Sequence, residues 1–248
     1  MSNFVTIALL AISPLSILGD FQSSSTITNN LILAEQTQIV VDEGAAKRVM
    51  AAETLRTLSQ EIPAAACNLH EKVDTQEAGE LLRASVAQFD SALLALRDGD
   101  EAHGIIGAEP VRRIQMEIDH LIAEWHPIHN AALAVLDDPD NMDAINVVYS
   151  STDTMLQQTY HLLSEIEAEY SNPVELLQSD MMLLEVSGRM AMMTQRLAYE
   201  SCRAWSSDYV EEYLEDLAQT MGQFEAGMNG LAYGLPALDI HPAPTPEI

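Results

Sequence analysis

The chain repeats part of its own sequence at a fixed offset. One segment, Ala52–Ile62, is followed by Cys67, and a similar segment, Ser187–Leu197, is followed by Cys202. The positions of the cysteines differ by 202 − 67 = 135, and those of Gln60 and Gln195 differ by the same amount. Each copy of an internal repeat is expected to form one structural unit. The sequence therefore predicts two equivalent helices that carry the only two cysteines at equivalent points.

The repeat extends past the cysteines, with Gly99 matching Gly234 at the same offset. Other matches at this offset are Leu82 with Leu217, Gln88-Phe89-Asp90 with Gln223-Phe224-Glu225, and Leu96 with Leu231. Beyond the glycine, Ile106 and Ile114 align with Ile240 and Ile248 at an offset of 134, which indicates a one-residue slip. We expect a signal-like segment over residues 1–34, a complete copy over 35–172 and a truncated second copy over 173–248.

The apolar residues recur at the spacing of an α-helix in six segments. These segments cover approximately residues 34–70, 74–97, 110–136, 142–170, 174–205 and 207–233. Leu, Ala and Glu dominate the composition, and these residues and the 12 methionines favour helices. No segment alternates with the period of two that is typical of strands. The sequence predicts an all-α fold, an up-down antiparallel bundle of about six helices with an internal pseudo-two-fold repeat.

The net charge of −27 limits the partners of this protein. Such a surface repels nucleic acid and anionic membranes, so we expect no nucleic-acid partner. Adaptation to solubility or salt explains this acidity most simply. Low-affinity cation binding is the alternative.

The N-terminal run Phe4–Gly19 is apolar but too short for a confident membrane span. It has the character of the apolar core of a secretory signal, although no basic residue precedes Lys47. We expect export to the periplasm or secretion, with no membrane span in the mature chain. A retained N-terminal anchor and a misassigned start are the alternatives.

Motifs for catalysis and metal binding are weak. His126 and His129 have a spacing that metals use, but Pro127 distorts that turn and no further ligand is evident. The methionines of residues 181–193 are typical of core packing rather than of a copper site. No nucleophile–base pair or phosphate loop stands out. We expect no enzymatic activity, no metal site and no cofactor.

Both copies carry a motif that resembles the signature of the PilJ-type domain, approximately A-G-R-Q-R-M-L-S-Q-R-M. This is the N-terminal sensing domain of type IV pili methyl-accepting chemotaxis transducers. The first copy has Leu58-Ser59-Gln60 after Arg56, and the second has Gly188-Arg189 leading to Met193-Thr194-Gln195-Arg196. The second copy matches better, because the first departs from the signature at Glu53, Glu61 and Pro63.

The first motif also resembles the ligand-binding box of nitrate/nitrite sensor kinases, A-G-S-L-R-M-Q-S-Y-R. Arg56 then takes the place of the arginine that contacts the anion in that family, and the second copy has Ala191 there. The resemblance implies a ligand site made by Arg56, Ser59, Gln60, Arg189, Thr194 and Gln195. Paired amides that fix helix register are the alternative for the two glutamines. A surface ion pair with Glu53 is the alternative for Arg56.

If the two motif helices pack in parallel, Cys67 and Cys202 lie at the same height. An oxidising compartment then favours a disulfide between them. Two buried, reduced cysteines are the alternative.

The resemblance implies a non-enzymatic, exported sensory module. We expect it to bind a small anion such as nitrate or nitrite and to signal to an envelope, pilus or transporter protein. The alternative is a structural or protein-interaction bundle in the cell envelope without a small-molecule ligand. A polar cavity between the motif helices would favour the ligand-binding sensory module. An apolar contact around Arg56 would favour the bundle without a ligand.

Overall fold

The computed structural model describes residues 25–170, 178–206 and 210–242. The chain divides into two compact units, residues 1–39 and residues 40–248. Most of the predicted signal-like segment, residues 1–24, lies outside the described residues. The predicted boundary near residue 172 stays a prediction.

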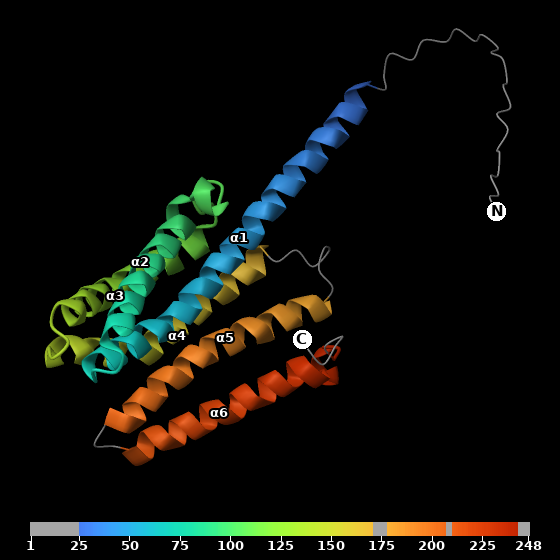
Figure 1. Cartoon of the computed structure of the whole chain (residues 1–248). Helices are drawn as coiled ribbons and strands as arrows, with labels where there is room; N and C mark the ends of the chain where they lie inside the picture. Colours follow the sequence, from blue (N-terminus) through green and yellow to red (C-terminus); the bar gives the residue numbers. More distant parts are fainter. Residues whose placement is uncertain (1–24, 171–177, 207–209, 243–248) are drawn as a thin grey trace, which may run out of the picture. The chain divides into compact units, whose positions relative to one another are not determined.

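Six helices form the described chain, which confirms the predicted all-α class (Figure 1). They are α1 (Ser25–His70), α2 (Thr75–Asp98), α3 (Arg112–Asp137), α4 (Met142–Tyr170), α5 (Gln178–Ser206) and α6 (Val210–Tyr233). Two short 3₁₀ turns, η1 (Glu101–His103) and η2 (Pro236–Leu238), follow α2 and α6. None of these described helices is both long and apolar enough to cross a membrane.

One helix boundary follows a local sequence signal, and another differs from the sequence expectation. Asn141 caps α4, since its side-chain oxygen accepts a hydrogen bond from the Ala144 amide at 3.1 Å. Helix α1 begins at Ser25 rather than near Ala34 as expected. The reason is that neither glycine nor proline interrupts residues 25–43, so nothing in that stretch ends a helix.

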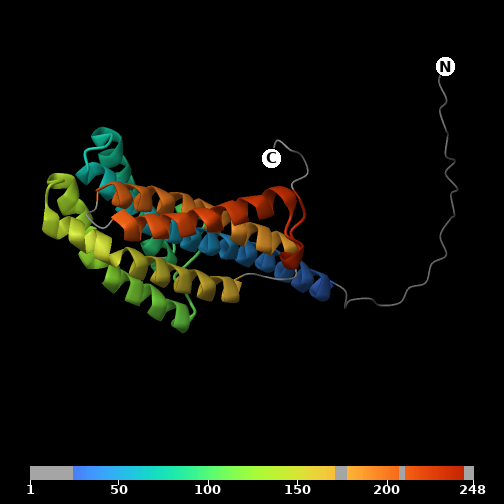
Figure 2. The same ribbon diagram turned by 90° about the horizontal axis from the view of Figure 1, so that it is seen from below.

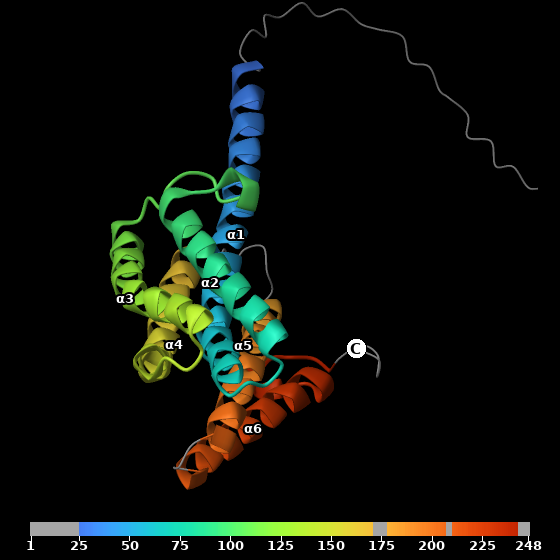
Figure 3. The same ribbon diagram turned by 60° about the vertical axis from the view of Figure 1, so that its left-hand side comes forward.

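The main core is built by α1 to α4, and α3 packs against both α2 and α4 (Figure 3). Phe89 of α2 stacks on Trp125 of α3 with ring centroids 4.2 Å apart. The Trp125 indole donates a hydrogen bond to Asp90 at 2.6 Å. These contacts bury the apolar face of α2 beneath α3.

Helices α5 and α6 pack on each other around a smaller cluster of methionines. Its buried members are Met190, Met192 and Met193, and Leu156, Phe224 and Leu231 pack against them. Leu156 belongs to α4, so this cluster also ties α5 to the first four helices. Helices α5 and α6 contain the second copy of the repeated sequence.

The turns after α2 and α6 have the same form. Gly99 and Gly234 adopt positive φ angles of 82° and 87°, a conformation that glycine adopts without strain. Isolated bridges Asp100–Ile105 and Leu235–Ile240 then close the two turns. The positions of their members differ by 235 − 100 = 135 and 240 − 105 = 135, the separation of the two cysteines. The expected slip of one residue is therefore wrong at this point, because the backbone keeps the offset of 135 through the whole turn.

A hydrogen bond between neighbouring helices also recurs. The Ser85 hydroxyl of α2 donates to Glu61 of α1 at 2.5 Å, and the Thr220 hydroxyl of α6 donates to Glu200 of α5 at 3.0 Å. Ser85 and Thr220 are equivalent positions of the repeat, since 220 − 85 = 135. In both places the second helix is thus fixed by a hydroxyl to a carboxylate on the motif helix.

Candidate functional site

The two motif helices meet along a parallel contact. Cys67 of α1 and Cys202 of α5 form a disulfide with their Cα atoms 6.2 Å apart, which confirms the predicted bond. Glu53 lies against Gly188, and the positions of these two residues have the same difference, 188 − 53 = 135. Equivalent positions are in contact at two points along the helices. Helix α5 therefore runs in the same direction as the part of α1 beside it (Figures 1 and 2). The parallel contact places the two sequence motifs face to face.

Gly188 permits the close approach of α5 to the first motif. A Cβ atom at this position would lie 2.8 Å from Glu53 Oε1 and 2.9 Å from Arg56 Nη2. Real side chains essentially never come so close to a Cβ atom. Any other residue would push the two helices apart or displace the Glu53–Arg56 pair.

Arg56 occupies the centre of this contact and is only 1% exposed. Its Nη2 lies 2.7 Å from Glu53 Oε2, and its Nη1 lies 3.4 Å from Glu185 Oε1 on α5. Arg189 also reaches Glu185, at 3.6 Å, from a half-exposed position. The expected ion pair with Glu53 is therefore present, but the Arg56 side chain is buried and does not lie on the surface. The guanidinium fork is held by planar carboxylates from both motif helices.

Three carboxylates surround Arg56, an excess of negative charge in a half-buried place. Oxygen atoms of Glu53, Glu167 and Glu185 all lie within 4.8 Å of one another. Burial, together with the neighbouring Glu185 and Glu167, raises the pKa of Glu53 to about 7 against the opposing effect of Arg56. Burial and Glu185 also raise the pKa of Glu167. Such a cluster has the spacing of metal ligands, but Arg56 already supplies a cation to it.

Sequence reasoning missed Glu167, Glu185 and Gly188 as parts of this site. Glutamates are too frequent in this chain to be informative, and Glu167 lies outside both motifs. Gly188 carried a usable signal, since an isolated glycine inside a helix often marks a close approach. Its counterpart in the first copy is Glu53, the residue that it contacts.

The other predicted ligand residues do not converge on Arg56. Ser59 donates to the Arg56 carbonyl at 2.7 Å, and the Gln60 amide donates to the Thr152 carbonyl of α4 at 3.4 Å. Thr194 is exposed and donates to its own helix at the Met190 carbonyl. Gln195 is half-buried. Of the six predicted residues, the structure brings Arg56 and Arg189 to the same carboxylate.

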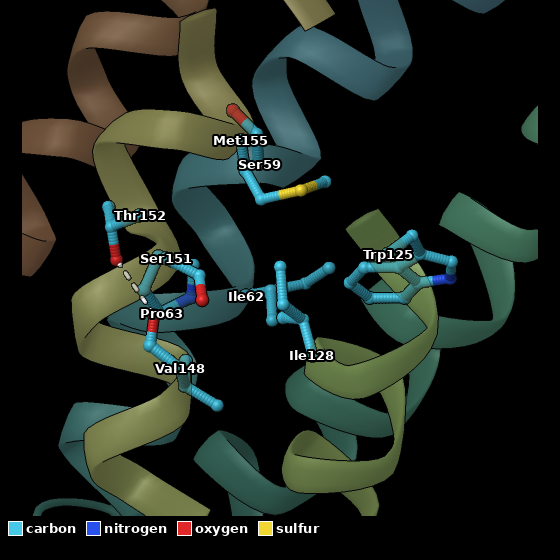
Figure 4. Close-up of a pocket in the computed structure, with 9 residues that line it drawn as sticks. All are labelled: Ser59, Ile62, Pro63, Trp125, Ile128, Val148, Ser151, Thr152 and Met155. Atoms are coloured by element: carbon cyan, nitrogen blue, oxygen red, sulfur yellow. Dashed lines mark hydrogen bonds between the residues drawn. The ribbon is translucent and has the colours of Figure 1, made fainter. Parts of the chain in front are cut away.

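A small cavity lies between α1, α3 and α4 (Figure 4). Its lining residues are Ser59, Ile62, Pro63, Trp125, Ile128, Val148, Ser151, Thr152 and Met155. The cavity measures about 10 Å³, which is room for about one water molecule. It is too small for nitrate, and neither Arg56 nor Arg189 lines it.

A second buried arginine, Arg48, has a purely structural environment. It donates to Glu109 at 3.1 Å and to the Gly107 carbonyl at 2.7 Å. Tyr170 donates to the same Glu109 at 2.6 Å, and its ring lies against the Arg48 guanidinium. This network locks α1 to the loop before α3 and to the end of α4. Its polar groups are paired with one another, so it offers no free group to a ligand.

A cation also joins α4, α5 and α6 near the disulfide. The Arg203 guanidinium lies 4.1 Å from the ring centre of Tyr149 and 4.8 Å from that of Tyr213. Arg203 also donates to the Tyr213 hydroxyl at 2.8 Å. The aromatic faces are thus occupied by a side chain of the protein itself, so this group acts in packing.

Residues 41–150 match the family model described as the type IV pili methyl-accepting chemotaxis transducer N-terminal domain, PilJ. That segment is similar to the PilJ-type domain. The matched region contains the first motif with Arg56 and ends inside α4, whereas the second motif lies beyond it. No curated protein and no solved structure shows a significant match to the chain. PilJ-type domains are sensory and non-catalytic, and the disulfide is typical of compartments outside the cytoplasm.

Proposed function

We propose that the protein is a non-enzymatic sensory module, exported to the periplasm or secreted, with a second, shorter PilJ-like copy in residues 173–248. The sensory class follows from the similarity of residues 41–150 to the PilJ-type domain. The repeated turns support the second copy, since their bridges recur at the same offset as the two cysteines. The disulfide supports export, because cytosolic disulfides are rare.

The ligand of this proposed sensor is a small planar anion such as nitrate or nitrite, bound at Arg56. The observation that carries this proposal is the buried guanidinium between the two motif helices. An arginine fork recognises two oxygens in one plane, and carboxylates of Glu53 and Glu185 now occupy that position. Nitrate has the same planar arrangement of oxygens. It would bind by displacing one of these carboxylates.

The displaced group would be Glu53. Its pKa is raised to about 7, so it takes up a proton at little cost once Arg56 no longer holds it. A protonated Glu53 also reduces the repulsion between an incoming anion and the acidic cluster. Anion binding is therefore expected to be weak, to take up a proton and to change the α1–α5 contact. That change is the signal which a partner protein in the envelope would receive.

Isothermal titration calorimetry with nitrate and with nitrite, at about pH 6 where Glu53 is largely protonated, tests this function. We expect millimolar binding to the wild-type chain and none to Arg56→Lys, which keeps the charge but loses the fork. Arg97→Lys on the surface is the matched control and should bind like the wild type. An absence of binding to the wild type would refute the anion site and leave the sensory family unaffected.

A second candidate function is a protein-interaction bundle without a small ligand. A row of exposed apolar side chains on α6 favours it, with Met221 55% exposed and Leu214 50% exposed. Both functions would operate in the same chain if the ligand site and the docking face are different surfaces.

A further inference from the structure

Helix α6 presents an apolar row to solvent. Leu214, Met221 and Met228 are 50%, 55% and 44% exposed. They follow one another every seven residues, so they lie on one face of the helix. We call these three residues the α6 stripe. The row beside it, Leu217, Phe224 and Leu231, is half-buried, and Phe224 and Leu231 pack on the methionine cluster of α5.

Two of the three equivalent positions on α2 are buried, and the third, the counterpart of Leu214, is Gly79. Val86 and Leu93, the repeat counterparts of Met221 and Met228, are 3% and 2% exposed. Helix α3 packs on this face of α2, because Trp125 donates a hydrogen bond at 2.6 Å to Asp90, which lies between Val86 and Leu93 on the same helix face. Within the described residues, α6 packs on α5, and its stripe remains open to solvent. Helix α3 thus covers this row on α2, whereas the equivalent row on α6 is left uncovered by the described residues.

We propose that the α6 stripe binds an amphipathic α-helix of a partner protein, in the way that α3 covers α2. This inference rests on the proposed second copy and adds the surface through which the module reaches its partner. The partner helix needs apolar residues at intervals of three and four, like the buried residues of α3. These are Ile114, Ile118, Leu121, Trp125 and Ile128. Methionines suit such a surface because their flexible side chains adapt to the residues that pack on them.

The charges beside the stripe indicate a basic partner. Glu211 lies one turn before Leu214, and Glu225 lies one turn after Met221; both are exposed. A second copy of this chain would bring the same acids together, and each chain carries a net charge of −27. A partner helix with Lys or Arg along its flanks would instead form ion pairs with them.

A designed peptide serves as the probe for this surface. It spans residue 111 and the α3 sequence, residues 112–137, with two of its exposed acids reversed by Asp119→Lys and Glu124→Lys. A control peptide carries Ile118→Glu and Leu121→Glu in addition, which removes the apolar face. Binding of the labelled peptides to the full, oxidised chain is followed by fluorescence anisotropy. The double variant Met221→Asp/Met228→Asp tests the stripe, and Met116→Asp, at a position on α3 that is 62% exposed, is the matched control.

We expect saturable binding that the stripe variant weakens by about tenfold or more, whereas Met116→Asp leaves it unchanged. The control peptide should not bind. Equal binding by the wild type and the stripe variant, or no binding at all, would overturn the proposal. So would sedimentation showing a wild-type dimer that the stripe variant dissociates, because a second copy would then occupy the face. Arg56→Lys should bind the peptide normally, so this result is separate from the anion test.

Discussion

Glu53 of α1 and Gly188 of α5 lie in contact across the interface of the two motif helices. They occupy equivalent positions in the proposed repeat, as do Cys67 and Cys202. The duplicated sequence thus builds a contact between equivalent positions with different chemistry. One copy supplies the acid and the arginine, and the other supplies the glycine that makes room for them.

The substitution Gly188→Ala should destabilise the fold by about 1–3 kcal/mol. The added methyl group would lie 2.8 Å from Glu53 Oε1 and 2.9 Å from Arg56 Nη2. Urea unfolding followed by circular dichroism measures the change. Gly222→Ala in α6 is the matched control, because nothing lies within 4 Å of its Cβ position. That variant should be neutral or more stable by about 0.5–1 kcal/mol, and equal losses in both would contradict this account.

Stability should fall as the pH rises through the titration range of Glu53. Burial raises the pKa of Glu53 from 4.5 to about 7, so the folded chain binds this proton more tightly than the unfolded chain. The proton stabilises the fold fully below about pH 4.5, and this stabilisation is lost by about pH 7. Comparing urea unfolding of the wild type and Glu53→Gln across that window isolates the effect. Glu53→Gln should lose this part of the pH dependence, and an unchanged slope would show that Glu53 does not titrate there.

Removal of the disulfide should cost about 2–5 kcal/mol, because the bond closes a long loop in the unfolded chain. Cys67 and Cys202 are 135 residues apart in sequence. The test compares unfolding of the wild type with that of Cys67→Ala/Cys202→Ala. Addition of a reductant should lower the stability of the wild type and leave the variant unchanged. Equal stability of the two proteins without reductant would contradict a stabilising bond.

The substitution Arg48→Met should cost about 3–5 kcal/mol, since it leaves a buried charge without its partner. The Glu109 side chain is 0% exposed and pairs with Arg48 at 3.1 Å. Thermal and urea unfolding both report this loss. Lys72→Met is the control, because its pair with Asp140 is exposed and should contribute little. A small loss of stability in both variants would contradict this prediction. It would mean that the hydrogen bond from Tyr170 is enough to stabilise the buried Glu109 carboxylate.

The helices and the disulfide could be predicted because they depend on patterns that persist along the chain. The apolar spacing indicated the six helices. The matched cysteines indicated how α1 and α5 are aligned along their axes. The surroundings of Arg56 could not be predicted, since Glu167 and Glu185 come from α4 and α5 and carry no motif of their own. Ser59 and Gln60 lie one turn along α1 from Arg56, but Ser59 donates to the Arg56 carbonyl and Gln60 donates to the Thr152 carbonyl of α4.

The dependence of nitrate affinity on pH tests the central claim most directly, that a small anion displaces Glu53 from Arg56. Calorimetry compares titrations at about pH 6 and about pH 8, on either side of the Glu53 pKa. We predict tighter binding at about pH 6, weaker binding with uptake of a proton at about pH 8, and binding to Glu53→Gln that does not change with pH. Nitrate affinity that is equal at both values in the wild type, or that is absent at both, would contradict it.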